Sequence, residues 1–167
     1  MKINYYFINT IIGKLTAVEK NNILVYIGLP DCKLDFIKNW CKKQFNNSNL
    51  NFIEIPKTIV KTQIEEYFSK KRNHFDVKFE LFTTDFRKLS LNAVAKIPYG
   101  ETKSYSDIAK QIGKPKAVRA VGSANATNTL PIIFPCHRVI TNNGGLGGYG
   151  GGLDMKIKLL DLEGWNK

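Results

Sequence analysis

The sequence places a cysteine, a histidine and an arginine in succession, Cys136-His137-Arg138, within the otherwise apolar run 130–140. A strand that only packs in a core would not be expected to contain these three side chains in succession, so the run predicts a reactive site. A cysteine reacts as its thiolate, which forms beside a base or in a positive field. An isolated cysteine in apolar surroundings is more often an inert small hydrophobe. The adjacent histidine therefore makes Cys136 a candidate nucleophile.

His137 is the candidate base for this nucleophile. Neighbouring side chains of an extended chain point to opposite sides, so we expect a water molecule or a bend in the chain to link His137 to Cys136. Such a base also needs a third group to fix its tautomer. Glu163, at the end of a predicted apolar helix over 154–162, is the candidate carboxylate.

The elements that must position these residues fall into two halves, which change character near residues 83 and 84. Before that point, short β-rich runs at 5–12 and 23–27 alternate with glycine and Asn-Asn turn signals, which predicts an antiparallel sheet. One amphipathic helix is predicted over 58–72, followed by a strand-like segment at 77–81. Charged runs in this half are interpreted as solvated ends of loops and helices.

The second half has helical spacing, beginning at Asp85 with an apolar stripe formed by Phe86, Leu89, Ala93 and Ile97. Ser104 and Asp107 then form a predicted capping box that starts a short helix ending at Gly113. A second helix is predicted over 116–125, and its apolar residues are unusually small. Two short helices joined by a glycine-containing turn have the outline of a helix-turn-helix.

The charge of the chain points to a polyanionic partner. The 167 residues include 25 Lys and Arg against 14 Asp and Glu, a net charge of +11. Nine basic but only two acidic residues lie between Phe86 and Arg138, so the predicted helix-turn-helix could neutralise phosphates. A surface made basic for solubility is the alternative. The composition, with 43% apolar residues, excludes a disordered, collagen-like or coiled-coil chain.

The cysteine pattern predicts neither a disulfide framework nor a metal site. Cys32, Cys41 and Cys136 form no CxxC pair, and we expect Cys32, Cys41 and His74 to be packing residues. A reducing compartment fits best. We expect no signal peptide and no membrane association, because the sequence has neither a basic segment before a long apolar core nor an apolar stretch of about 18 residues.

The second half resembles a known family, the O6-alkylguanine-DNA alkyltransferases, also called methylated-DNA-protein-cysteine methyltransferases. The strongest similarity is the Phe-Pro-Cys-His-Arg-Val-Ile segment at 134–140. Further segments follow the family in order: 97–105, 117–122 with Ala124-Asn125 and Asn128, 148–153, Leu159-Leu160 and Glu163-Gly164. Residues 1 to about 83 show only a β-rich pattern that is compatible with the family.

The resemblance implies an α+β protein with two lobes. Residues 1–83 would form a ribonuclease-H-like α/β lobe with a structural role, and residues 84–167 a mostly helical winged helix-turn-helix lobe that binds DNA and accepts the alkyl group. The implied activity is DNA repair by single-use transfer of the alkyl group from O6-alkylguanine in double-stranded DNA to Cys136, after the nucleotide has been flipped out. O4-alkylthymine is a second candidate substrate. Some members of the family use an N-terminal zinc site, but Cys32, Cys41 and His74 are not at metal-ligand spacing, so we expect no metal and no cofactor. We also expect a cytoplasmic location (nuclear in a eukaryotic host) and a monomer, with cooperative loading on DNA left open.

The resemblance also implies roles for individual residues around the thiol. Cys136 would accept the alkyl group, with His137 as the base acting through water and Glu163 orienting it. Asn128 would bind backbone around the active-site turn, and Tyr105 would crowd the flipped nucleotide's phosphate and protonate the leaving guanine. The implied DNA-binding residues on the second helix are Arg119, Ala120, Gly122, Ala124 and Asn125. Arg119 would fill the gap left by the flipped base, an ordinary phosphate contact being its alternative.

The glycine-rich segment 144–152 would supply the wing and the lip of the pocket. It lacks the Gly-Lys-Ser/Thr ending of a phosphate-binding P-loop, and simple hairpin turns are the alternative. The implied pocket residues are Pro131, Val139, Tyr149, Gly150 and Gly151. Carbonyls of Cys136 and Val139 would accept hydrogen bonds from the exocyclic amine of guanine.

Two departures from the family pattern bear on the substrate. Thr129 stands where many members have a proline, and Gly150 where some carry a hydroxyl that could bond to O6. Two other functions remain open: a damage sensor, whose relatives replace the cysteine that this chain retains, and a winged-helix transcriptional regulator without chemistry. Preference for a lesion over a DNA sequence would separate repair from regulation.

Overall fold

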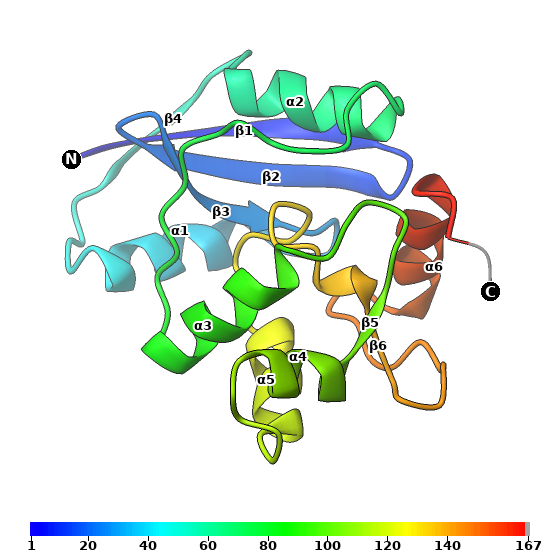
Figure 1. Ribbon diagram of the computed structural model, residues 1–167. Coiled ribbons are helices and arrows are strands. Elements are labelled where there is room, and N and C mark those ends of the chain that lie inside the picture. Colours follow the sequence, from blue (N-terminus) through cyan, green and yellow to red (C-terminus); the bar gives the residue numbers. More distant parts are fainter. Residues whose placement is uncertain (166–167) are drawn as a thin grey trace. The chain divides into compact units, whose positions relative to one another are not determined.

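The computed structural model describes residues 1–165 and is of mixed α+β type, with most of the strands near the N-terminus and most of the helices after them (Figure 1). The chain divides into two units, one over Met1–Phe82 and one that begins at Thr83. Over the described residues, every helix is too short or too polar to cross a lipid bilayer. The two units are described in turn.

The first unit is built on a four-stranded sheet with the order β3-β2-β1-β4. The strands are β1 (Lys2–Thr10), β2 (Gly13–Lys20), β3 (Ile23–Gly28) and β4 (Asn51–Glu54). The first three pair antiparallel, as predicted, whereas β4 pairs parallel with β1. Asn21 and Asn22 both have positive φ, 52° and 61°, which is the two-residue hairpin turn that an Asn-Asn pair favours.

Two helices accompany this sheet, α1 (Leu34–Gln44) and α2 (Ile59–Phe68), where the sequence pattern predicted only the second. Helix α1 buries Ile37 and Cys41 in a cluster with residues of the sheet. Its apolar pattern is obscured because Phe36, next to the buried positions, is 59% exposed. The strand-like segment predicted at 77–81 pairs with β3 only through an isolated parallel bridge between Leu24 and Phe79, so it is shorter than a full strand.

Short helices and a two-stranded pairing make up the second unit. The elements are α3 (Asp85–Val94), β5 (Lys103–Ser104), α4 (Tyr105–Gln111), α5 (Val118–Ala126), the 3₁₀ turn η1 (Cys136–Arg138), β6 (Val139–Ile140) and α6 (Leu153–Leu162). The predicted capping box is present: the Ser104 hydroxyl accepts from the Asp107 N–H, and the Asp107 carboxylate accepts from the Ser104 N–H. Gly113, with φ of +70°, follows the end of α4 as predicted.

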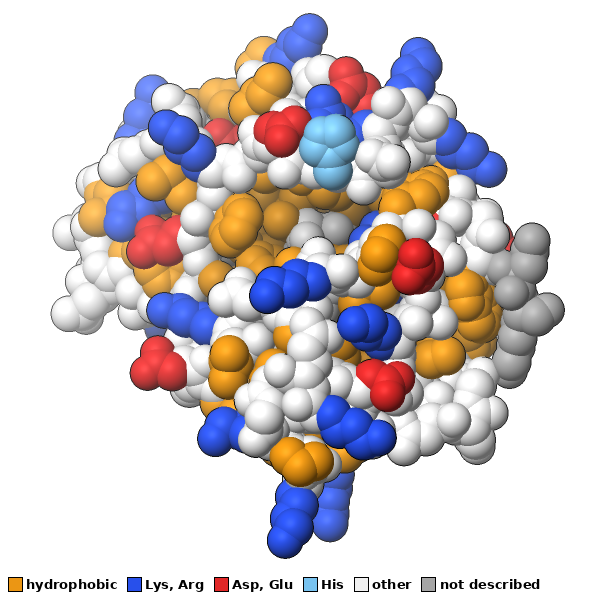
Figure 2. Space-filling model, viewed as in Figure 1, with side chains coloured by type: hydrophobic (Ala, Val, Ile, Leu, Met, Phe, Trp, Pro, Cys, Tyr) orange, Lys and Arg blue, Asp and Glu red, His pale blue; other side chains and the backbone are white. Residues whose placement is uncertain are grey.

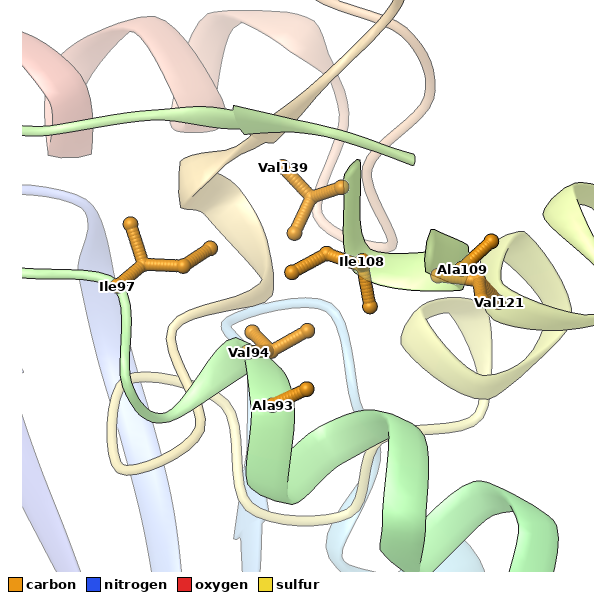
Figure 3. Close-up of a cluster of buried hydrophobic side chains, with 7 residues drawn as sticks. All are labelled: Ala93, Val94, Ile97, Ile108, Ala109, Val121 and Val139. Carbon is orange, nitrogen blue, oxygen red and sulfur yellow. The ribbon is translucent and has the colours of Figure 1, made fainter. Parts of the chain in front are cut away.

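A small aliphatic core holds the helices of the second unit together (Figure 3). It consists of Ala93, Val94, Ile97, Ile108, Ala109, Val121 and Val139. One residue of the predicted α3 stripe is wrong, because Leu89 is 44% exposed while Leu91 is buried. Parallel pairing of β5 with β6 sets Lys103 opposite Val139, so the residues before α4 lie beside those that follow the Cys-His-Arg turn.

Candidate active site

Cys136 is the first residue of the short turn η1 rather than part of an extended strand. A bend was one of the two expected ways of linking Cys136 to His137, and it is present here, because consecutive residues of a 3₁₀ turn do not alternate across a strand. Four residues before the turn, the β-branched residue Ile132 has an unusual backbone conformation, with φ of 77°. Cys136 itself is only 6% exposed.

Asn128 holds the backbone around this turn. Its side-chain Nδ2 donates to the Phe134 carbonyl at 2.9 Å and lies 3.3 Å from Cys136 Sγ, while its Oδ1 accepts from the Leu130 N–H at 3.0 Å. One amide therefore joins three positions of the segment 130–136. The contact to sulfur stabilises a thiolate and opposes the effect of burial, which raises the pKa of Cys136.

His137 and Glu163 are brought together from positions far apart in the sequence. His137 Nε2 lies 2.9 Å from Glu163 Oε1, and both side chains are fully buried. Because the carboxylate accepts, Nε2 carries the proton, and Nδ1 keeps its lone pair. Nδ1 is buried without a hydrogen-bond partner in residues 1–165. Burial lowers the pKa of His137, so the ring is a neutral base in the free protein.

Arg138 shares the same carboxylate, a contact that the sequence reasoning missed. Its Nε and Nη2 each donate to Glu163 at 2.8 Å, and its Nη1 donates to the Ile97 carbonyl at 2.7 Å. Burial opposes the charge of Glu163, but hydrogen bonds from His137 and Arg138 outweigh it and lower the pKa of Glu163 to about 2. Glu163 is thus a carboxylate throughout the neutral range.

A cavity of about 360 Å³ opens next to Cys136. Its lining residues are Tyr105, Gly122, Asn125 and Ala126 from α4 and α5, with Cys136, Gly148, Tyr149 and Gly150. The volume is large enough to admit a small flat ligand such as a nucleobase. Tyr149 and Gly150, predicted for the pocket, line this cavity.

The other three predicted pocket residues are not among those that line the cavity. The side chain of Val139 is fully buried in the aliphatic core (Figure 3). Its carbonyl accepts from Lys156 at 2.6 Å. Pro131 is buried and forms an isolated bridge with Phe134. Gly151 is outside the set that lines the cavity. The sequence motif does not distinguish these three positions from residues that line the cavity, because each is one or two residues away from a residue that lines it or forms a turn.

Helix α5 presents the predicted DNA-binding residues in two groups. Arg119 and Ala120 are exposed near its start, while Gly122 and Asn125 line the cavity. Ala124 differs from the expectation, because its side chain is fully buried on the same face as Val121. Figure 2 shows basic side chains spread over the face in view, including some that project at the end occupied by the turn between α4 and α5.

Tyr105 lies close to the glycine-rich segment. Its hydroxyl donates weakly to the Gly148 carbonyl at 3.5 Å, and burial raises its pKa, so it is a protonated donor at neutral pH. Gly147 has φ of +71°, and a Cβ there would lie 3.1 Å from the Tyr105 ring. Only glycine suits this close approach. Hairpin geometry alone therefore does not account for the glycine at position 147, whereas a Cβ at Gly148, Gly150 or Gly152 would meet nothing within 4 Å in the described chain.

Lys156 is a second functional residue that the sequence reasoning missed. It is fully buried on α6, and its Nζ donates to the carbonyls of Val139, Leu146 and Gly148. Burial lowers its pKa to about 8. A signal was present, because Lys156 lies three and four residues before the apolar pair Leu159-Leu160 and so shares their helix face.

The three cysteine and histidine candidates of the first unit behave differently from one another. Cys41 is buried in the core of that unit and Cys32 packs against it, as expected for packing residues. The expectation for His74 is wrong: its side chain is 70% exposed and lies 3.3 Å from Asp76. Its neighbours in the sequence are polar, which favours the surface.

Comparison with known proteins bears on this site directly. Residues 85–165 match the family model described as 6-O-methylguanine DNA methyltransferase, DNA binding domain. The inducible methylated-DNA–protein-cysteine methyltransferase of Bacillus subtilis is 42% identical over 160 residues, 96% of this chain and 84% of that protein. The methylated-DNA–protein-cysteine methyltransferase of Mycolicibacterium paratuberculosis is 38% identical over 163 residues, 96% and 92% of the two chains.

Solved structures agree in fold. The crystal structure of Mycobacterium tuberculosis OGT in complex with DNA superposes with a TM-score of 0.83 at 38% identity, covering 96% of this chain and 92% of that one. The O6-methylguanine methyltransferase of the same organism gives the same TM-score at 37% identity. The resemblance read from the sequence motifs is thus confirmed, and the chain belongs to the methylated-DNA–protein-cysteine methyltransferase family.

Proposed function

We propose that this protein repairs DNA by transferring the alkyl group of O6-alkylguanine to Cys136 in a single-use reaction. The observation that carries the proposal is the position of the Cys136 thiol, at the wall of a cavity that can admit a nucleobase and next to the buried pair His137 and Glu163. The relatives' names and the DNA-bound structure support the same activity.

Each residue of the site has a separate role in the proposed reaction. The thiol proton of Cys136 passes through water to His137 Nδ1, whose proton on Nε2 is held by Glu163. Sulfur then attacks the alkyl carbon, a carbon–sulfur bond forms and the carbon–oxygen bond breaks. The electron pair of the broken bond returns to the guanine ring, which takes up one proton, supplied by way of Tyr105. The products are unmodified guanine and a cysteine thioether. The proton that His137 took from Cys136 passes through water to replace the one given by Tyr105, so both residues return to their neutral forms and atoms and charge balance.

The thioether explains why each molecule acts once. A thioether sulfur has no ionisable proton and is a poor leaving group, so the nucleophile is not regenerated. An acyl-transfer enzyme would instead hydrolyse its intermediate with the help of an oxyanion hole. The stable product makes the reaction stoichiometric with the protein.

In this proposal, the second unit contacts the DNA. Helices α4 and α5 act as a helix-turn-helix within a winged lobe, the exposed Arg119 fills the space left by the extruded base, and the surrounding lysines contact phosphates. The first unit acts as a ribonuclease-H-like structural lobe. The substrate is double-stranded DNA with O6-alkylguanine, bound by a single copy of the chain.

Intact-protein mass spectrometry tests the proposal. The protein is mixed with excess duplex containing O6-methylguanine, and we expect a stoichiometric gain of one CH₂ group mapped to the peptide with Cys136. Cys136→Ser should bind the duplex but gain no mass, because a serine hydroxyl is far less acidic than a thiol. An unmodified duplex is the second control. Lesion binding without mass gain by the wild-type protein would make it a damage sensor, and absence of lesion preference would overturn the proposal.

A further inference from the structure

A tight turn lies between α3 and β5, within the 97–105 segment, of which the reaction described above uses only Tyr105. The Glu101 N–H donates to the Pro98 carbonyl at 3.1 Å, which closes a four-residue turn. Gly100, the third residue of this turn, has φ of 78°. Turns with positive φ at the third residue favour glycine there, so its presence has a local explanation.

The surroundings of Gly100 go beyond this local explanation. A Cβ at this position would lie 2.9 Å from the backbone oxygen of Glu163, closer than Cβ atoms come in real structures, and a backbone atom cannot rotate away. The Gly100 N–H also donates a long hydrogen bond, 3.4 Å, to Glu163 Oε2. Gly113 is the contrast, because its φ of 70° is similar but a Cβ there would meet nothing within 4 Å in residues 1–165. The turn therefore contacts both the main chain and the side chain of Glu163.

Tyr99 adds two contacts from the same turn. Its hydroxyl donates to the Leu162 carbonyl at 3.2 Å, and Leu162 is the last residue of α6, where carbonyls have no partner within the helix. Its ring lies 5.7 Å from the guanidinium of Arg138, the group that shares the Glu163 carboxylate with His137. The turn thus holds the end of α6 and covers the cation that binds Glu163.

The position of Glu163 matters because one of its oxygens fixes the tautomer of His137. Glu163 Oε1 accepts from Nε2 at 2.9 Å, which leaves Nδ1 as the base. Glu163 directly follows the last residue of α6, and helix ends fray, so contacts from other segments are needed to hold its carboxylate. The turn at Gly100 supplies such contacts from outside η1.

We propose that Gly100 is a positioning residue that holds Glu163 in place against His137. Only glycine lets the turn approach the Glu163 backbone this closely, and the Gly100 N–H adds a donor to those that already bind the carboxylate. The inference rests on the proposed function and deepens it, because it names the segment that keeps the base of the reaction aligned.

Gly100→Ala and Gly113→Ala form a matched pair for the test. Both place a β-carbon on a backbone with positive φ, but only the first pushes on Glu163. Methyl transfer is measured in single turnover with saturating duplex containing O6-methylguanine, so that differences in DNA affinity do not enter. At neutral pH we expect Gly100→Ala to react about tenfold more slowly than wild type because its base is misaligned. Gly113→Ala should match wild type.

The pH dependence of the rate separates misalignment from a general loss of structure. Hydroxide takes the Cys136 proton increasingly well as pH rises, without help from His137, so the deficit of the Gly100 variant should shrink between neutral pH and about pH 9. Local unfolding would instead reduce the rate by the same factor throughout. The charged groups around His137 are Glu163, Arg138 and Lys156, and the substitution leaves all three in place.

A double-mutant cycle tests whether Gly100 acts through Glu163. In Glu163→Gln the carboxylate is already gone, so adding Gly100→Ala should slow transfer little further. Thermal melting checks that each variant is folded. If Glu163→Gln does not fold, the pH dependence and the Gly113 control decide alone.

Tyr99→Leu replaces Gly100→Ala if the latter does not fold. It removes the contacts to Leu162 and Arg138 without straining the backbone, and we expect the same deficit at neutral pH and the same recovery at high pH. Tyr99→Phe, which keeps the ring over Arg138, should recover part of the rate.

The outcomes separate this inference from the proposed function. If wild type transfers methyl and the folded Gly100→Ala reacts as Gly113→Ala does, the inference is overturned and the repair function stands. A deficit that stays constant with pH, or that is as large in Glu163→Gln as in wild type, would also overturn it. If wild type does not transfer methyl at all, the repair function itself fails.

Discussion

Lys156 Nζ lies 2.6 Å from the carbonyl oxygen of Val139, and the same ammonium donates to the carbonyls of Leu146 and Gly148. A single buried cation therefore joins α6 to β6 and to the glycine-rich segment that lines the cavity. Lys156 holds the segment through hydrogen bonds to its backbone carbonyls, so the position of the segment depends little on its own side chains.

Lys156→Met should loosen this segment. Methionine fills similar space but leaves three carbonyls without their donor, so we expect a loss of about 1–3 kcal/mol in the free energy of unfolding. Methyl transfer should slow as well, because Gly148, Tyr149 and Gly150 line the cavity. Urea unfolding and single-turnover kinetics measure the two effects. Lys158→Met, at an exposed position of the same helix, is the control and should change neither. Unchanged kinetics in the Lys156 variant would mean that the segment keeps its position without the ammonium.

Glu163 predicts how stability depends on pH. Its pKa is lowered to about 2 in the folded protein from an ordinary value of 4.5, so the unfolded chain binds the proton more readily. The stabilising contribution is complete above about pH 5 and is lost as pH falls toward 2. Its size is up to about 3 kcal/mol.

Glu163→Gln should remove this dependence. The difference in unfolding free energy between wild type and variant should be largest near pH 6 and shrink as the pH approaches 2. Urea titrations at several pH values measure it, and Asp154→Asn, an exposed carboxylate of the same helix, is the control. A constant difference from pH 6 to pH 2 would contradict the role given to the Glu163 charge.

Gly147→Ala should displace Tyr105. The backbone has positive φ at this position, and the added Cβ would meet the tyrosine ring at 3.1 Å. We expect a loss of about 1–2 kcal/mol in unfolding free energy and a slower transfer reaction. Gly113→Ala is a close control, because φ there is +70° but the Cβ would enter open space. Equal kinetic effects in the two variants would assign the loss to backbone strain and not to Tyr105.

Arg119→Ala should affect duplex substrates selectively. Arg119 is exposed on α5 and does not line the cavity, so the variant should slow transfer from O6-methylguanine in a duplex more than transfer from the free alkylated base. Lys116→Ala, which removes an exposed charge near the same helix, should weaken duplex binding mainly at low salt. Equal slowing with duplex and free base would exclude the gap-filling role of Arg119.

The sequence predicted the second unit better than the first for a physical reason. Turn and capping signals are local, so the capping box at Ser104 and the glycine after α4 could be identified without knowing the fold. Helix α1 and the parallel pairing of β4 depend on burial against distant strands, and local periodicity does not carry that information.

The same distinction applies within the site. The pairing of His137 with Glu163 was expected because a histidine base needs a group that fixes its tautomer. In the structure, His137 Nε2 lies 2.9 Å from Glu163 Oε1. The roles of Arg138 and Lys156 were missed because a buried cation is identified by its acceptors, which here are a distant carboxylate and backbone carbonyls. Backbone acceptors have no sequence signature.

The dependence of the site on α6 has a consequence for synthesis of the chain. Cys136 and His137 are made before Lys156 and Glu163, and the latter two lie on α6 or at its end. A growing chain that has produced the nucleophile but not yet α6 lacks the carboxylate for its base and the cation for its pocket. We therefore expect the chain to reach its full reactivity only after almost the whole second unit has been translated.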